Sequence, residues 1–230
     1  MSKKIDVLDN GYVILQDVMG SDLSVVNSAR ASYGKKEENL TPAGERLIAF
    51  LAREGHTSPF RHATMQFEVR TPLMIARQWW KYVVGSTWQD PLQAWNESSR
   101  RYITETNQYH LPEYFRLAPE NSKQGSGGPI SADLNAKWLD ILAHHQMRGE
   151  QIYQDMMKDG ICAEQARLAL PAYGLYVTFY WTASLQGVIH LINQRVDKEA
   201  QWEFQQFAQA VETFAKNHFP VSLEELRKNG

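Results

Sequence analysis

The chain has 230 residues and a formal net charge of −2, so it has no basic surplus with which to neutralise nucleic-acid phosphates. Its hydrophobic share of 43% and charged share of 22% are typical of a globular protein, and no linker divides the expected single domain, residues 1–230. The single cysteine, Cys162, excludes an internal disulfide and a multi-cysteine zinc site. No apolar run reaches membrane-spanning length and the N-terminus lacks an apolar signal core, so we expect a cytoplasmic protein without nucleic-acid or membrane partners.

The N-terminal part of the chain predicts a hairpin followed by helices and a strand. Residues 4–9 and 12–18 have strand patterns on either side of Asn10-Gly11, a pair that is typical of tight hairpin turns. Pro59 is expected to extend the residue before it, Ser58, and to exclude a helix there. Later patterns predict helices over residues 22–33 and 42–54 and a half-buried strand over residues 63–70.

Pro72 begins a helix that carries the central stretch, residues 76–102, with the sequence ARQWWKYVVGSTWQDPLQAWNESSRRY. Its aromatic rings offer stacking surfaces, and its arginines offer paired donors for phosphate, which together suit a nucleotide or a flavin. The alternative is a core helix with an aromatic face and a solvated basic end. Glycine, serine and proline within residues 84–94 predict a loop that folds back over the site, with Trp88 or Trp95 against a ligand or a neighbouring subunit.

The second half of the chain predicts mostly helices. Residues 133–158 form a long amphipathic pattern, in which the adjacent His144 and His145 diverge and predict no metal site. A short helix then presents Arg167, and Cys162 is expected to pack because no nearby residue would activate its thiol. Other patterns predict an irregular segment over residues 103–118, a strand over 175–182 and helices over 184–194 and 197–217.

The central stretch resembles the signature of the flavin-dependent thymidylate synthases. In that family ARQWF is followed by Arg-His-Arg, seven residues and a serine, and the signature ends in NE-x-S-x-RY. The chain matches at Ala76–Trp80 and at Asn96–Tyr102. The middle differs, because Lys81–Val83 replaces Arg-His-Arg and fifteen residues, 84 to 98, precede Ser99. Three further segments match family elements: GHTSPFRH at 55–62, ICAEQARLALP at 161–171, and AQWE at 200–203 after Arg195.

The resemblance implies an α+β fold with a small antiparallel sheet embedded among long helices, assembled as a homotetramer with shared sites. It implies reductive methylation of dUMP to dTMP with FAD, and with NADPH and 5,10-methylenetetrahydrofolate as co-substrates. Arg195 is implied to be catalytic, lying near N3 and O2 of uracil and polarising the ring. The residues implied to bind dUMP are Gln78, Trp79, Trp80, Lys81, Glu97, Ser98, Ser99, Arg100, Arg101, Arg167 and Arg195. Those implied to border FAD are His56, Ser58, Lys81, Tyr82, Val83, Glu97, Ser184, Leu185, Gln186 and His190.

Two alternatives stay open at this point. The altered middle of the signature motivates a related flavin enzyme that modifies another pyrimidine nucleotide or transfers a different one-carbon state. The other alternative is a non-catalytic nucleotide-binding homologue, against which the presence of Arg195, Arg167, Ser99 and Arg101 argues. Product analysis with dUMP and dCMP separates the first alternative from a thymidylate synthase.

Overall fold

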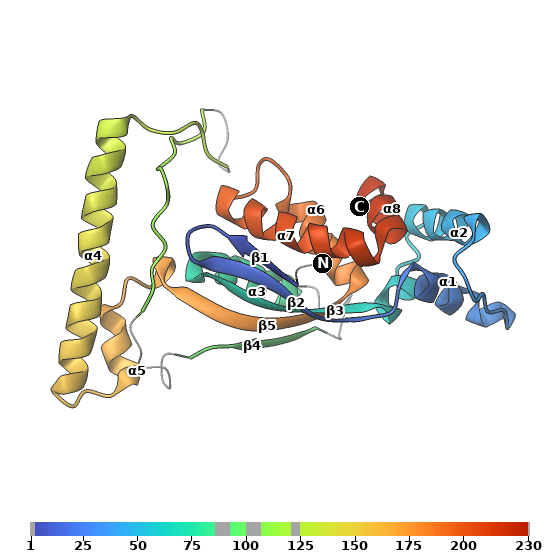
Figure 1. Ribbon diagram of the computed structural model, residues 1–230, viewed down its shortest axis with the longest axis horizontal. Helices are drawn as coiled ribbons and strands as arrows, with labels where there is room; N and C mark the ends of the chain where they lie inside the picture. The colour runs from blue at the N-terminus through green and yellow to red at the C-terminus, as the bar shows by residue number, and fades with distance from the viewer. Residues whose placement is uncertain (1–2, 86–92, 100–106, 121–124, 230) are drawn as a thin grey trace.

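The computed structural model describes residues 3–85, 93–99, 107–120 and 125–229. A five-stranded antiparallel sheet runs through it in the order β1-β2-β3-β5-β4 (Figure 1). The strands are β1 (Lys4–Val7), β2 (Gly11–Met19), β3 (Thr64–Pro72), β4 (Ala94–Glu97) and β5 (Tyr176–Ser184). This sheet among helices confirms the predicted α+β class.

Eight α-helices are present in the described residues: α1 (Asp22–Arg30), α2 (Pro42–Arg53), α3 (Leu73–Gly85), α4 (Ala132–Lys158), α5 (Ala163–Ala166), α6 (Leu185–Arg195), α7 (Trp202–His218) and α8 (Pro220–Lys228). Figure 1 shows α6, α7 and α8 over one side of the sheet, with α4 standing apart from the body. We call α4 and the described residues 107–120 and 125–131, which lead into it, the arm. None of the described helices is both long and apolar enough to cross a membrane.

The alternating patterns of the central strands fill the core as predicted. Met65, Phe67 and Val69 of β3 are each 0% exposed, and Trp181 of the neighbouring β5 stacks on Phe67 at 5.8 Å between ring centroids. Alternate residues of a strand point to opposite faces, so one face of the sheet packs against the helices. The carboxyl end of β5 passes directly into α6, and this connection fixes where α6 lies against the sheet.

Several local predictions were wrong. Ser58 begins a 3-10 helix (Ser58–His62) because Pro59 fits its first turn. The last long helix begins at Trp202 rather than at 197, since the Asp197 carboxylate accepts a hydrogen bond from the Glu199 amide at 2.8 Å and forms a turn there. Cys162 is exposed at the N-terminus of α5 instead of packing.

The long amphipathic helix is present, but its apolar stripe does not pack on the core of this chain. Leu134, Trp138 and Ile141 of α4 are 44–48% exposed. A stripe of large apolar side chains left in water on a helix marks a contact surface.

Candidate active site

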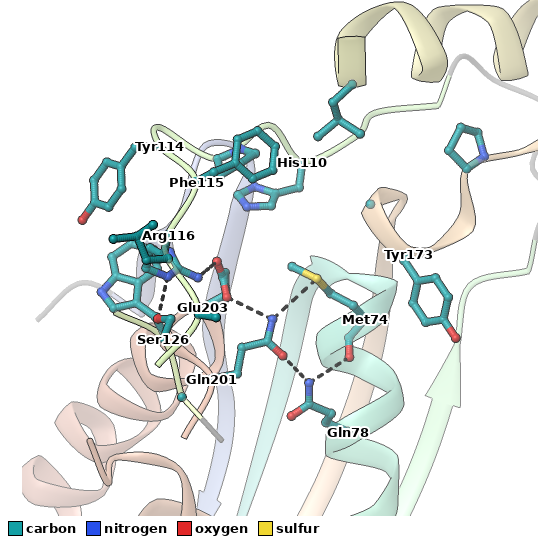
Figure 2. Close-up of a pocket in the computed structure, with 18 of the residues that line it drawn as sticks. Met74, Gln78, His110, Tyr114, Phe115, Arg116, Ser126, Tyr173, Gln201 and Glu203 are labelled. Carbon is teal, nitrogen blue, oxygen red and sulfur yellow. Dashed lines mark hydrogen bonds and ion pairs between the residues drawn. The ribbon is translucent and has the colours of Figure 1, made fainter. Parts of the chain in front are cut away.

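A pocket lies between the arm and the body, with a volume of about 1060 Å³ (Figure 2). Pockets for small molecules commonly measure about 300–1,000 Å³, so this one has room for more than a single nucleotide. The body contributes Met74 and Gln78 from α3, Arg195 from α6 and Gln201–Glu203 from the start of α7. The arm contributes aromatic and basic groups, including Tyr114, Phe115, Arg116, His110 and His145.

Arg195, the last residue of α6, presents a cation to this pocket. Its guanidinium lies 5.2 Å from the ring centre of Tyr82 and 5.1 Å from that of Phe204. Its Nε–H is buried and has no hydrogen-bond partner among the described residues. Burial raises the pKa of Tyr82, and the Arg195 charge opposes that rise. The rings fix the guanidinium while leaving donors for a ligand.

A chain of polar side chains crosses the pocket floor from α3 to the arm (Figure 2). Gln78 Nε2 donates to Gln201 Oε1 at 2.5 Å, and Gln201 Nε2 donates to Glu203 Oε2 at 2.9 Å. Arg116 of the arm forms an ion pair with the other oxygen of Glu203 and also donates to Ser126 at 2.9 Å. Burial acts to raise the pKa of Glu203, but the bonds from Arg116 and Gln201 outweigh it and hold the pKa below its usual range.

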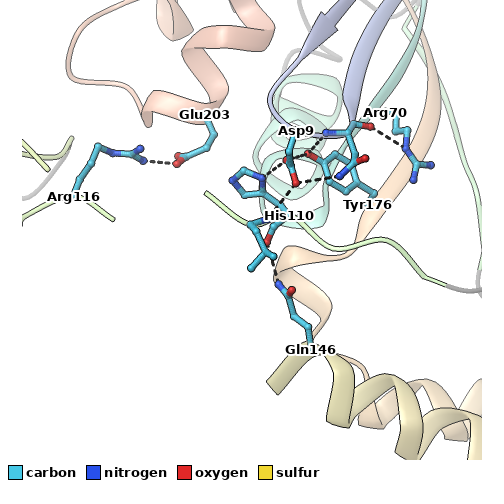
Figure 3. A network of polar contacts seen from close by, with 9 residues as sticks. Asp9, Arg70, His110, Arg116, Gln146, Tyr176 and Glu203 are labelled. Atoms are coloured by element: carbon cyan, nitrogen blue, oxygen red, sulfur yellow. Dashed lines mark hydrogen bonds and ion pairs between the residues drawn. The ribbon is translucent and has the colours of Figure 1, made fainter. Parts of the chain in front are cut away.

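A second polar network fastens the arm to the sheet (Figure 3). The Asp9 carboxylate, in the β1–β2 turn, lies 2.6 Å from His110 Nδ1 and accepts hydrogen bonds from the Tyr176 hydroxyl at 2.5 Å and the Leu111 amide at 3.2 Å. Burial acts to raise the pKa of Asp9, but the hydrogen bonds dominate and lower it strongly. Burial and the Asp9 charge together raise the pKa of Tyr176. No pattern in the sequence predicted this network.

The lowered pKa of Asp9 predicts an acid-sensitive contribution to stability. The stabilisation is present above the pKa of an unfolded aspartate, about 3.9, and is lost as the pH falls through the lower folded value. Asp9→Asn should therefore reduce the free energy of unfolding by about 2 kcal/mol at pH 7 and by much less near pH 2. Urea denaturation at both pH values measures the difference.

The matched control for this prediction is Asp6→Asn, on the same hairpin. Asp6 pairs with Lys4 at 2.7 Å, but its side chain is 78% exposed, so its loss should cost less than about 0.5 kcal/mol. An Asp9→Asn variant as stable as the parent at pH 7, or equally destabilised at both pH values, would contradict the assigned role.

The residues expected to border FAD lie along α6 and at its beginning. Ser184 caps the helix by accepting from the Gly187 amide at 3.2 Å. Gln186 and His190 are half-buried on one face, and burial lowers the pKa of His190, whose ring lies 5.8 Å from that of Tyr82. Gln186 Oε1 is buried without a partner in the described part of the chain, so an N–H donor of a flavin ring would satisfy it.

The other residues expected at the flavin divide between surface and core. His56 and Ser58 are exposed beside the beginning of α6, where the Leu185 amide donates to Ala63 O at 2.8 Å. Leu185 and Val83 have side chains in the hydrophobic core, at 0% and 6% exposure. These two side chains are therefore enclosed by protein in this chain.

The aromatic residues of the central stretch serve mainly packing in the described chain. Trp79 is 0% exposed, stacks on Phe204 at 5.4 Å between ring centroids, and lies in the core. Trp80 is 38% exposed and contacts Trp95, which itself stacks on Phe179 at 3.8 Å. Trp95 thus has partners within its own chain. The predicted fold-back of residues 84–94 involves Trp88 and residues 86–92, which lie outside the described residues.

The polar residues expected to hold dUMP are dispersed. Lys81 is exposed, and Ser98 extends the β4–β5 pairing by accepting from the Thr178 amide at 3.1 Å. Glu97 is exposed as a whole, yet burial of its carboxyl by the surrounding protein raises the pKa of that group. Ser99 is half-buried, while Arg100 and Arg101 lie outside the described residues.

Arg167 is exposed just after α5, where its Nε donates to Glu164 O at 3.1 Å, and it does not line the pocket that contains Arg195. Of the residues expected to bind dUMP, the structure brings Gln78 and Arg195 together in one pocket. The remaining described members of that set do not line this pocket.

Comparison with known proteins agrees with this architecture. A family model described as thymidylate synthase complementing protein matches residues 14–221. The flavin-dependent thymidylate synthase of Thermosipho africanus is 33% identical over 223 residues, covering 96% of this chain and 93% of that protein. An enzyme of the same name from Thermus thermophilus is 35% identical over 218 residues, covering 95% of this chain and 76% of that protein.

A solved structure is similar over nearly its full length. The UMP/dUMP methylase PolB from Streptomyces cacaoi, bound with 5-Br dUMP, superposes with a TM-score of 0.83 at 28% identity, covering 98% of each chain. The fold, the family match and the relatives thus agree, and the chain belongs to the flavin-dependent thymidylate synthase family.

Proposed function

We propose that the protein is a flavin-dependent thymidylate synthase that methylates dUMP at C5 of the uracil ring. The overall reaction takes dUMP, 5,10-methylenetetrahydrofolate, NADPH and a proton to dTMP, tetrahydrofolate and NADP⁺. The observation that carries the proposal is Arg195, a fixed cation with a buried donor that has no partner in the described residues, on the wall of a nucleotide-sized pocket. The pocket faces this donor with Gln78 and the aromatic residues of the arm.

The protein groups bind, orient and polarise the substrate. When bound, FAD would supply the redox and one-carbon transfer chemistry, so the reaction would require no protein nucleophile. This agrees with the position of Cys162, which lies outside the pocket. Arg195 would donate to O2 of uracil and stabilise the negative charge that develops as C5 becomes nucleophilic. Gln186, His190 and the cap residue Ser184 would hold the flavin along α6.

The site is proposed to be completed by other subunits of a homotetramer. The exposed stripe of Leu134, Trp138 and Ile141 on α4 supports an interface, because neighbouring exposed apolar side chains are typical of protein–protein contact surfaces. The position of Arg167 outside the pocket also supports sharing, since a phosphate-binding arginine must reach a neighbour's site from there.

A second candidate is methylation of UMP. The favouring observation is the near-complete superposition on the UMP/dUMP methylase PolB. In addition, Lys81–Val83 stands where the family has Arg-His-Arg, and lysine binds phosphate as a point charge without the planar fork of arginine. An altered phosphate contact changes how the nucleotide is held in the site. A changed preference between the ribose of UMP and the deoxyribose of dUMP would arise from such a change.

The deciding assay incubates purified protein with FAD and follows flavin absorbance, then NADPH oxidation with and without dUMP. We expect flavin uptake and dTMP as the product identified by chromatography. Equal rates with UMP and dUMP would establish the second candidate alongside the first. A protein that takes up no flavin and forms no methylated nucleotide would refute both candidates.

A further inference from the structure

The polar chain on the pocket floor determines which way the side-chain amide of Gln78 points. A glutamine amide has a donor end and an acceptor end of nearly the same shape, so its orientation follows from its partners. The chain ends at Glu203, a residue that is 4% exposed and whose carboxylate is held ionised by Arg116. An ionised carboxylate only accepts hydrogen bonds. Glu203 therefore fixes the orientation of each amide that follows it.

The consequences pass from one side chain to the next. Gln201 must turn its Nε2 toward Glu203, at 2.9 Å, which leaves its Oε1 as the acceptor that faces Gln78. Gln78 must then turn its own Nε2 toward Gln201, at 2.5 Å, and the carbonyl of Met74, at 3.4 Å from the same nitrogen, requires the same orientation. The reversed Gln78 amide would bring its oxygen against two acceptors.

The amide oxygen of Gln78 is thus the end available to a ligand. None of the described residues donates a hydrogen bond to it (Figure 2), and the lining of the pocket includes both Gln78 and Arg195. The pocket then offers an acceptor from Gln78 and donors from Arg195. Uracil presents the complementary edge, an N3–H donor between two carbonyl acceptors, whereas cytosine presents an acceptor at N3 and a donor at its 4-amino group.

We infer that Arg116, Glu203 and Gln201 are positioning residues that make Gln78 select uracil over cytosine nucleotides. This inference rests on the proposed function, because it assumes that the pocket binds a pyrimidine nucleotide. Gln78 Oε1 accepts from N3–H of uracil and meets the lone pair of cytosine N3, and Arg195 donates to the ring carbonyl. Arg116 anchors the chain from the arm, so base selection depends on the arm being seated against α7.

The test compares the dissociation constants of dUMP and dCMP on the FAD-loaded protein by calorimetry. We expect the parent to bind dUMP at least about 100-fold more tightly than dCMP, since a buried acceptor facing an acceptor is costly. Glu203→Gln keeps the shape but can present a donor to Gln201, which lets Gln201 reverse and leaves Gln78 held only by its 3.4 Å contact with the Met74 carbonyl. The preference for dUMP should fall to less than about tenfold.

The matched control is Glu212→Gln, which removes a carboxylate from the same helix α7. Glu212 forms an ion pair with Arg227 of α8 and does not line the pocket, so its variant should keep the parental preference. Because Glu203→Gln leaves Arg116 unpaired and could unfold, Gln201→Met provides a second break in the chain without unpairing a charge. It should reduce the preference to the same extent.

The outcomes separate this inference from the proposed function. A parent that forms dTMP but binds dCMP as tightly as dUMP overturns the inference alone. The same holds if Glu203→Gln or Gln201→Met is folded and retains the parental preference. A flavin-loaded parent that binds neither nucleotide and forms no dTMP overturns the proposed function, and the inference falls with it.

Discussion

Replacing Arg195 by alanine should lower dTMP formation by about 10²–10³-fold while FAD remains bound. The guanidinium is held over Tyr82 and Phe204, and it has a buried donor that lacks a partner in the described protein. Because the donor is already in place, little reorganisation is needed when the transition state forms. Such a group acts mainly on the charge that develops in the transition state. The loss should therefore appear in turnover more than in the dissociation constant of dUMP, as measured by single-turnover kinetics.

Two further variants isolate the donors of Arg195 from its packing. Arg195→Met retains the apolar stem beside Tyr82 and Phe204 but has no donor, and it should be as slow as the alanine variant. Arg53→Ala removes an exposed arginine that pairs with Glu54 on the surface and should keep full turnover. Near-parental turnover by both Arg195 variants, with flavin bound, would remove Arg195 from the mechanism.

The regular elements were largely predictable because each carries a local pattern. Strand β3, predicted over residues 63–70, spans Thr64–Pro72, and the helix predicted over 184–194 is α6, Leu185–Arg195. Alternation and helical spacing indicate that one face of an element is buried, and both patterns can be read from residues that are close together in the sequence. The beginning of α7 was predicted too early because a turn made by Asp197 competes with the helix, and periodicity does not register such a turn.

The site was predictable only where a residue belongs to a patterned element. Gln78 was named from the family signature and Arg195 from its place before the AQWE segment, and both line the pocket. Trp79 was expected to contact a ligand, although its spacing from Ile75 and Val83 places it on the buried side of α3. That helical spacing was a signal already available in the sequence.

The residues that were missed lack any local signal. Asp9 and His110 meet across 101 positions of sequence, and Arg116 meets Glu203 across 87. His110 and Arg116 lie in a segment predicted only as irregular, because it has no helix or strand in the described residues. Their contacts arise from how the arm is placed against the body, which no short-range pattern encodes.

Arg167 and Arg195 are expected to reach one site from different subunits. Arg167→Ala should be about as inactive as Arg195→Ala, because a lost phosphate contact weakens the hold on dUMP that orients the ring. If the two arginines of one site come from different subunits, mixing the two inactive proteins should restore activity. In randomly mixed tetramers about a quarter of the sites receive both intact arginines, which sets the expected recovery relative to the parent.

The experiment co-expresses the two variants with different affinity tags, isolates the doubly tagged assembly and measures dTMP formation. Light scattering on a sizing column gives the mass, which should be that of four chains of 26.4 kDa.

The control pairs Arg195→Ala with a protein carrying both substitutions, a mixture in which no subunit has an intact Arg195, and it should stay inactive. Activity in that control would show that the recovery does not depend on Arg195. A doubly tagged tetramer that stays inactive while the parent is active would show that each site takes both arginines from one chain. A monomeric mass at micromolar concentration would contradict shared sites altogether, because the exposed position of Arg167 after α5 would then leave it without a pocket to serve.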